Sequence, residues 1–280
     1  GVKIKDISRA FYQDFINEYG KNHAKNTVVK TTRLIKSSLK DAVADGIIAK
    51  NPAVHINMVY DTKRSEHVDY LSVEELKTLV KTLFAGLRED NTSRYMILAG
   101  IFTGARIGEI MALSWDDIDF NNCTITISKS YDYMNKNIKE PKTASSCRTI
   151  TAPAVLLEAL KMLKNNDPLF VFVKPGRIPD NLTISDSERL ARGLPTITAV
   201  NKCLRINLKR AGLNNKMHFH SLRHCHVAYL AAVGVDWYSI SKRLGHANLS
   251  TTLNVYAYLV DESKKKNDKL ITNSLNNLIY

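Results

Sequence analysis

Apolar side chains recur at helical spacing through the first 45 residues of the chain. Residues 6–19 carry one at every fourth position, at Ile7, Phe11, Phe15 and Tyr19. Such a stripe predicts a helix, which Gly20 ends. A second helix is expected from about Asn26 to Asp45, before Gly46 and an Asn-Pro turn; its apolar side is formed by Val28, Thr32, Ile35, Leu39 and Val43. Residues 1–58 are therefore expected to form a small helical domain.

A linker and a helix start follow this domain. Residues 59–70 belong to a stretch without sustained periodicity, which is typical of a linker. Ser72 followed by Glu75 forms a capping box ahead of an apolar run, so a helix should begin there. We expect a second domain over residues 71–280, with a C-terminal tail at 261–280.

The pattern of the second domain is mixed. Helical periodicity occupies roughly 94–114 and begins again near 153, 198, 221, 235 and 251. Alternation at 123–129 and 147–151 predicts two strands that could pair antiparallel. The apolar run at 170–173 could be another strand, which periodicity alone leaves open. The predicted fold class is mainly α with a small antiparallel β-sheet (α+β).

Charge adds a candidate partner. Forty Lys and Arg against 27 Asp and Glu give a formal net charge of +13 and a pI near 9.5. This excess is expected of a protein that neutralises phosphates, although many basic proteins are merely kept soluble by it. On the second helix, one face carries Lys30, Arg33, Lys36 and Lys40. These side chains could follow a DNA backbone or form a solvated face, and the sequence leaves both readings open.

Composition also excludes several classes of protein. No apolar run approaches the roughly 20 residues that span a bilayer, and no signal peptide is evident, so a soluble intracellular protein is expected. The cysteines lack a C-x-x-C pair, which argues against disulfides and a cysteine zinc site. Because the chain begins with Gly rather than Met, we expect that an N-terminal module is absent from it.

Two segments carry side chains suited to binding phosphate. In TGARIGEI, Arg106 follows a Thr-Gly break, and Glu109 is close enough to orient its guanidinium. In FHSLRHCH, His220 and Arg223 share a helix face, and both can donate hydrogen bonds to a phosphate oxygen. An isolated Arg/Glu pair on a helix is usually a surface ion pair, so the functional interpretation depends on the motifs together.

A third segment supplies a nucleophile. In RLGHANLSTTLNVYAYL, Gly245 ends a helix, His246 follows it, and Ser250 can cap a helix that carries Tyr256. A tyrosine at such a position is most often a core residue, and the chain has twelve. Only the surrounding pattern distinguishes this one.

A metal site is the weaker alternative. His220 and His224 have i, i+4 spacing, but no third ligand or general base accompanies them. We therefore interpret the additional histidines as structural; they are His218, His224 and His226. The acidic residues of WDDIDF are interpreted as turn and strand-entry residues; they are Asp116, Asp117 and Asp119.

Together these motifs resemble the signature of the tyrosine recombinase, or phage integrase, family. The matching residues, in the family's order, are Arg106, His220, Arg223, His246 and Tyr256. The helical unit ending in DGIIAKNP (45–52) is similar to the family's core-binding domain, so the resemblance covers nearly the whole chain. In EPKTASSCRTI, Lys142 matches the family's lysine in a β-hairpin turn, with Lys136 and Lys139 as competitors. One departure is that Tyr258 replaces a frequent His two residues after the nucleophile.

The resemblance implies a reaction and partners. Arg106 and Arg223 would clamp the scissile phosphate with help from His220 and His246, Tyr256 would form a 3′-phosphotyrosine, and Lys142 would protonate the leaving 5′-hydroxyl. His220 would accept the tyrosine proton, and the two arginines with His220 would make the tyrosine reactive at neutral pH. No metal or other cofactor is required by this mechanism.

The expected partners are double-stranded DNA attachment sites, three further protomers in a synaptic homotetramer, and an excision factor or DNA-bending protein, in the cytoplasm and nucleoid of a bacterial host. The tail at 261–280 would dock on a neighbouring subunit or fold back on its own core. The alternatives are a type IB topoisomerase-like enzyme and a non-catalytic DNA-binding regulator.

Overall fold

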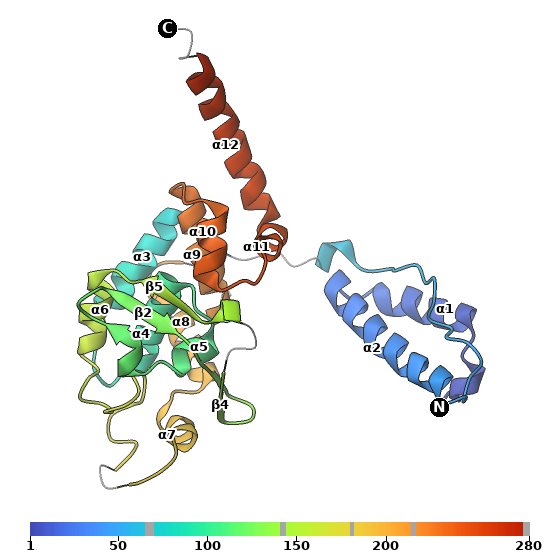
Figure 1. Ribbon diagram of the computed structural model, residues 1–280, viewed down its shortest axis with the longest axis horizontal. Helices are drawn as coiled ribbons and strands as arrows, with labels where there is room; N and C mark the ends of the chain where they lie inside the picture. Colours follow the sequence, from blue (N-terminus) through green and yellow to red (C-terminus); the bar gives the residue numbers. More distant parts are fainter. Residues whose placement is uncertain (65–69, 141–143, 180–181, 214–216, 277–280) are drawn as a thin grey trace. The chain divides into compact units, whose positions relative to one another are not determined.

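The structure is a computed structural model that describes residues 1–64, 70–140, 144–179, 182–213 and 217–276. The chain divides into two units, Gly1–Val68 and Asp69–Tyr280 (Figure 1). Each unit has its own buried apolar cluster.

The first unit is helical. Its elements are η1 Ile4–Asp6, α1 Arg9–Gly20, α2 Lys25–Ala44 and η2 Thr62–Arg64. Helix α2 buries Val28 and Leu39 as the periodicity predicts, and Gly46 follows its end with a φ of +70°. The predicted helix ending at Gly20 is confirmed, and Tyr19 of its stripe packs against the core, but the fully buried residues of α1 are Tyr12 and Ile16.

Packing against α2 selects the buried face of α1. Ser8 accepts a hydrogen bond from the amide of Phe11, so the helix begins at Arg9, and its apolar residues sit on two adjacent rows. The row with Tyr12 and Ile16 meets α2. Phe11 and Phe15 remain 46% and 37% exposed.

The second unit is mainly helical with a small sheet, which confirms the predicted fold class. Its helices are α3 Val73–Phe84, α4 Thr92–Thr103, α5 Ile107–Met111, α6 Ala154–Lys161, α7 Asp186–Gly193, α8 Ile197–Arg210, α9 Phe219–Ala232, α10 Trp237–Leu244, α11 Leu249–Val255 and α12 Ala257–Asn276. Short 3₁₀ turns are η3 Trp115–Asp117 and η4 Ala144–Ser146. The predicted capping box is present, since Ser72 and Glu75 cap α3 reciprocally.

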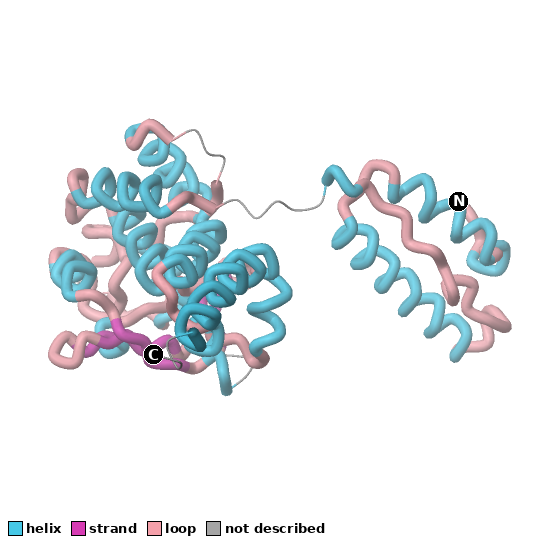
Figure 2. Tube along the Cα trace, turned by 90° about the horizontal axis from the view of Figure 1, so that it is seen from above, coloured by secondary structure: helices cyan, strands magenta, loops and turns pink. Residues whose placement is uncertain are grey.

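The strands gather at one edge of the second unit (Figure 2). They are β1 Ile118–Asp119, β2 Thr124–Ile127, β3 Ser130–Asp132, β4 Asn137–Lys139 and β5 Arg148–Thr151. The predicted antiparallel pairing is confirmed, because β2 pairs with β5 in the register Ile125 to Ile150. Residues 170–173 are buried but joined to Ser114 only by an isolated bridge at Phe170, so they form no regular strand.

Helix α4 lies at the centre of this unit. All but one of its residues are buried, and it contacts α5, α6, α8 and α9. A helix that is apolar on all sides is expected in such a position. The Thr-Gly break predicted within the helical stretch 94–114 is confirmed, because Gly104 ends α4 with a φ of +65° and α5 begins at Ile107. A side chain at Gly104 would also collide with His226, since a Cβ would lie 2.6 Å from its Cδ2.

The C-terminal helix α12 stands out from the rest of the second unit (Figure 1). It contacts α9 and α11. Its last described residues, 271–276, are all exposed, so this end does not fold back on the core of its own chain.

Candidate active site

Arg106 is placed by the break between α4 and α5. Its backbone is extended and forms the N-cap of α5, which leaves its side chain about half exposed. Glu109 accepts hydrogen bonds from the Arg106 amide at 2.8 Å and from its guanidinium at 2.9 Å. The predicted orienting contact is therefore present, and it uses both ends of Arg106.

Arg148 on β5 forms an ion pair with the same Glu109. It was not among the residues predicted from the sequence. Its guanidinium donates to both carboxylate oxygens of Glu109, at 2.9 and 3.3 Å, and both side chains are buried. It also donates to the carbonyls of Arg243, at 2.7 Å, and Ser146, at 3.1 Å. Arg148 therefore ties the start of β5 to α5 and to the end of α10. The S-x-R spacing in EPKTASSCRTI was visible in the sequence but served only to locate Lys142.

Burial and hydrogen bonding act in opposite directions on Glu109. Burial raises the pKa of its carboxyl, but the bonds from Arg148 and the Arg106 amide outweigh burial and leave that pKa below its usual value. Glu109 is accordingly ionised at neutral pH and can hold both guanidinium groups.

Arg223 lies beneath the surface on α9. It donates to the carbonyls of Gly104 at 2.7 Å and Leu244 at 2.8 Å, and to Nε2 of His246 at 2.9 Å. The last bond makes Nε2 an acceptor, so Nδ1 of His246 carries the proton and donates to the Thr252 hydroxyl at 2.7 Å. Burial, with the charge of Arg223, lowers the pKa of His246 to about 4, which agrees with a neutral ring.

His220 faces the same region from the start of α9. It is exposed, and its pKa is lowered by partial burial and by the positive charges of Arg223 and Arg106. The electrostatic effect of both arginines on His220 and His246 indicates that these four predicted residues converge.

Tyr256 ends α11 and is 1% exposed. Its hydroxyl lies 2.8 Å from Nδ1 of His224. Burial raises the pKa of Tyr256 to about 12, although the charge of Arg223 acts to lower it. In this conformation desolvation of the phenolate outweighs the predicted activating effect of the arginines and His220 on the pKa of Tyr256.

The additional histidines differ in role. His226 is buried and structural, as predicted, and His218 is an exposed residue at the N-cap of α9. His224 corrects the prediction, since its ring is the hydrogen-bond partner of the candidate nucleophile. Neither i, i+4 spacing nor composition points to this contact between α9 and α11.

The predicted lysine, Lys142, lies outside the described residues. Of its competitors, Lys139 forms an ion pair with Asp132, and Lys136 is an exposed turn residue with a φ of +50°. A recess of about 520 Å³ opens beside Arg106, and Lys129 and Lys139 are among its lining residues.

The described residues contain no group of three His, Cys, Asp or Glu that could hold a metal ion. The acidic residues of WDDIDF serve turns, as predicted. Asp117 accepts from the Ser114 amide and pairs with Lys129, and Asp119 accepts from two amides in the following turn.

The predicted DNA-binding residues lie on α2 in the first unit. All four side chains are exposed, and no ion pair engages them within the described part of the chain: Lys30, Arg33, Lys36 and Lys40. No described helix is long and apolar enough to cross a membrane.

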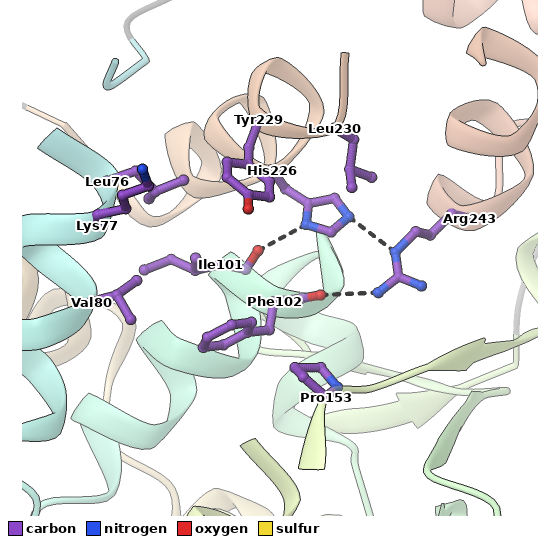
Figure 3. A pocket seen from close by; sticks show the side chains of 10 residues that line it. All are labelled: Leu76, Lys77, Val80, Ile101, Phe102, Pro153, His226, Tyr229, Leu230 and Arg243. Carbon is purple, nitrogen blue, oxygen red and sulfur yellow. Dashed lines mark hydrogen bonds between the residues drawn. The ribbon is translucent and has the colours of Figure 1, made fainter. Parts of the chain in front are cut away.

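His226 and Arg243 form a hydrogen-bonded pair next to the candidate site. His226 lies 2.8 Å from the Ile101 carbonyl and accepts a bond from Arg243 at 3.1 Å, while Arg243 also donates to the Phe102 carbonyl at 3.0 Å (Figure 3). These side chains line a largely apolar pocket of about 350 Å³ between α3, α4, α9 and α10. The pair holds the end of α10, from which His246 follows.

His226 should make the protein less stable in acid. Burial and the charge of Arg243 lower its pKa to about 3, against an ordinary value of 6.5. A histidine with a depressed pKa contributes stability that is complete above pH 6.5 and is lost as pH falls towards the folded value. As pH falls from 6.5 towards 3, we expect His226 to lower the free energy of unfolding by up to about 1.4 kcal/mol for each pH unit.

Urea denaturation between pH 7 and pH 5 measures this slope. His226→Gln should flatten it, whereas His218→Gln, at an exposed histidine, should leave it unchanged. Equal slopes for wild type and His226→Gln would contradict the assignment.

Comparison with known proteins identifies both units. The profile of the phage integrase family matches residues 69–263, and that of the phage integrase SAM-like domain matches residues 1–58. The integrase of Staphylococcus phage L54a is 27% identical over 99% of this chain and 81% of its own length. A protein described as tyrosine recombinase XerC-like, from Caldanaerobacter subterraneus, is 27% identical over 94% of this chain and 70% of its own.

Solved structures agree on the fold. The integrase of transposon Tn1549, in complex with a circular intermediate DNA, superposes with a TM-score of 0.71 at 22% identity, covering 96% of this chain and 87% of that one. A lambda integrase dimer bound to a core site has a TM-score of 0.59 at 16% identity, over 90% and 81% of the two chains. Because the family profile spans most of the sequence, the chain belongs to the phage integrase family of tyrosine recombinases, enzymes of site-specific DNA recombination.

Proposed function

We propose that this enzyme cleaves and rejoins double-stranded DNA at the attachment sites of a mobile element, through a 3′-phosphotyrosyl intermediate at Tyr256. The observation that carries the proposal is the convergence of Arg106, Arg223 and His246 around the break after α4. Arg106 is held by Glu109, and Arg223 bonds the Gly104 carbonyl and His246. Two fixed guanidinium groups suit a phosphodiester, since each can donate two hydrogen bonds to its oxygens.

The reaction follows from these residue types. Attack by the Tyr256 oxygen forms a bond to phosphorus and breaks the bond to the 5′-oxygen, while Arg106 and Arg223 stabilise the charge on the non-bridging oxygens. His220 accepts the tyrosine proton, and Lys142 donates a proton to the leaving 5′-oxygen. The 5′-hydroxyl of a partner strand reverses the attack, so exchange needs no ATP. This substrate places the action of the enzyme at the nucleoid of a bacterial host.

A suicide duplex carrying a candidate attachment site, nicked near the scissile phosphate, tests the function. Incubation in EDTA should yield a protein–DNA band that survives denaturant. A second assay supplies two sites on separate duplexes and looks for joined products. Relaxation of supercoiled DNA without joining would favour a topoisomerase-like enzyme, and bound DNA without an adduct would favour a non-catalytic regulator.

We propose that the exposed cations of α2 contact the DNA backbone. Each phosphate contact releases counterions, so Lys36→Ala and Lys40→Ala should each reduce the slope of log affinity against log salt by about 0.9. Fluorescence anisotropy between 50 and 200 mM salt measures the slope. Lys21→Ala is the control, because Lys21 already pairs with Glu18 at 2.6 Å. Unchanged slopes for both α2 variants would assign these lysines to a solvated face.

We also propose that four protomers assemble on two DNA sites, joined by α12. Ile271 and Leu275 lie one turn apart on this helix and are 55% and 57% exposed. The apolar pocket of Figure 3 offers a neighbour's helix an apolar recess. An excision factor or a DNA-bending protein would direct the assembly.

Replacing Ile271 and Leu275 by charged residues should weaken assembly and leave cleavage at a single site unchanged. Combined Ile271→Asp and Leu275→Asp should remove the four-protomer complex in sedimentation of protein with DNA. Ser274→Asp, on an exposed residue between them, is the matched control. Loss of the complex in both proteins would indicate a general effect of charge.

A further inference from the structure

Two histidine rings of α9 connect the phosphate-binding face to Tyr256. His220 is exposed at that face, and the ring of His224, one turn later, lies edge-on to it with centroids 5.0 Å apart. The His224 ring also meets Tyr256 edge-on at 5.4 Å, and its Nδ1 lies 2.8 Å from the tyrosine hydroxyl. His224 therefore separates the candidate nucleophile from the exposed side chains that would receive the phosphate.

Tyr256 is withdrawn in this arrangement. It packs in a small apolar cluster with Val227, Ile240 and Leu244, and only 1% of it is exposed. Arg106 and His220, in contrast, are open to solvent. Because Tyr256 is enclosed and those two side chains are open, attack on a phosphate held there requires the tyrosine to become exposed.

The electrostatics of the pair favour a protonated tyrosine. Burial raises the pKa of Tyr256 to about 12, and burial with the charges of His220 and Arg223 lowers the pKa of His224 to about 4. The His224 ring is thus neutral at neutral pH, and its tautomer decides whether Nδ1 accepts or donates the hydrogen bond to the tyrosine hydroxyl. Both pKa shifts disfavour transfer of the tyrosine proton to this ring while both side chains stay buried.

The backbone at Tyr256 provides a place for the change. Tyr256 lies between α11 and α12 with φ −112° and ψ 27°, outside the helical region. Its amide bonds the Thr252 carbonyl at 3.0 Å, and the Thr252 hydroxyl bonds His246 at 2.7 Å. The turn that carries the nucleophile is therefore attached to a residue of the phosphate-binding group, through which bound DNA can act on it.

We propose that His224 is a positioning residue that holds Tyr256 withdrawn in the DNA-free enzyme, and that cleavage requires this hydrogen bond to be released. The inference rests on the proposed function of Tyr256 as nucleophile. This hydrogen bond keeps the tyrosine from reacting until DNA occupies the site.

His224→Phe tests the proposed restraint of Tyr256, because it keeps an aromatic ring and removes the nitrogen that bonds the tyrosine hydroxyl. Nitration of the DNA-free protein by tetranitromethane, with Tyr256 and Tyr258 distinguished by tandem mass spectrometry, reports the accessibility of Tyr256. We expect faster nitration of Tyr256 in this variant. Covalent adduct on the suicide duplex should form roughly two- to tenfold faster, the range that one neutral hydrogen bond is worth.

Two further variants control the result. His224→Asn places a side-chain amide, which can donate or accept, near the position of Nδ1 and should restore slow nitration, which a merely structural role for the ring would not do. His218→Phe removes an exposed histidine at the start of the same helix and should not change the nitration of Tyr256. If circular dichroism shows that His224→Phe is unfolded, His224→Leu replaces it.

An unchanged rate of Tyr256 nitration in the folded His224→Phe or His224→Leu variant would overturn the proposal that His224 holds Tyr256. Faster nitration with slower adduct formation would also overturn it, because His224 would then assist attack. Absence of any adduct from wild type would refute the proposed function instead, and the nitration result would still decide whether His224 holds Tyr256.

Discussion

Tyr256→Phe is expected to abolish the covalent protein–DNA adduct, with a loss of at least about 10⁴-fold in the rate of cleavage. The reason is that the substitution removes the oxygen that would form the bond to phosphorus in the proposed reaction. The substitution keeps the ring that fills the apolar cluster and removes one hydrogen bond, to His224. Stability should therefore fall by only about 1 kcal/mol. Adduct formation on the suicide duplex and urea denaturation measure the two effects.

Tyr258→Phe is the matched control, since it removes the neighbouring hydroxyl. It should still form the adduct. If Tyr258→Phe loses the adduct and Tyr256→Phe retains it, the nucleophile is Tyr258. DNA binding by both variants, followed by anisotropy, excludes a loss that arises from affinity.

Arg148→Met is expected to reduce both stability and cleavage. Arg148 and Glu109 are buried together, so the substitution leaves an ionised carboxylate without its main partner. Breaking a buried pair in this way costs about 3–5 kcal/mol. Cleavage should slow in the folded fraction as well. Without Arg148, Glu109 is no longer fixed in position, so it orients the Arg106 guanidinium less well. Urea denaturation and single-turnover adduct formation measure the two effects.

Two comparisons distinguish the effect of breaking the buried Arg148–Glu109 pair from the effect of losing any positive charge. Arg192→Met removes an exposed i, i+4 partner of Glu188 and should cost less than about 0.5 kcal/mol. Adding Glu109→Gln to Arg148→Met removes the unpaired buried charge and should recover part of the stability without restoring cleavage. A loss for Arg148→Met no larger than that for Arg192→Met would show that the pair does not support the site.

Local signals predicted much of the fold. The capping box at Ser72, the end of the second helix at Gly46 and the strands at 123–129 and 147–151 depend on residues close in sequence, and each prediction is confirmed. The break at Gly104 within the helical stretch 94–114 is confirmed as well. The stripe on the first helix did not identify the fully buried residues, because two adjacent rows of α1 are apolar, and only packing against α2 selects one.

The sequence by itself determined the family and the orienting contact between Arg106 and Glu109, and it predicted the order of the proposed phosphate-binding and nucleophilic residues. These features lie within a few residues of one another or within motifs of fixed spacing. The tertiary structure alone decided that Arg148 bonds Glu109 from 39 positions away and that His224 bonds Tyr256 from 32 positions away. It also decided that Tyr256 is buried and has a raised pKa. Desolvation and hydrogen bonding depend on which distant segments pack together, and local spacing carries no record of that packing.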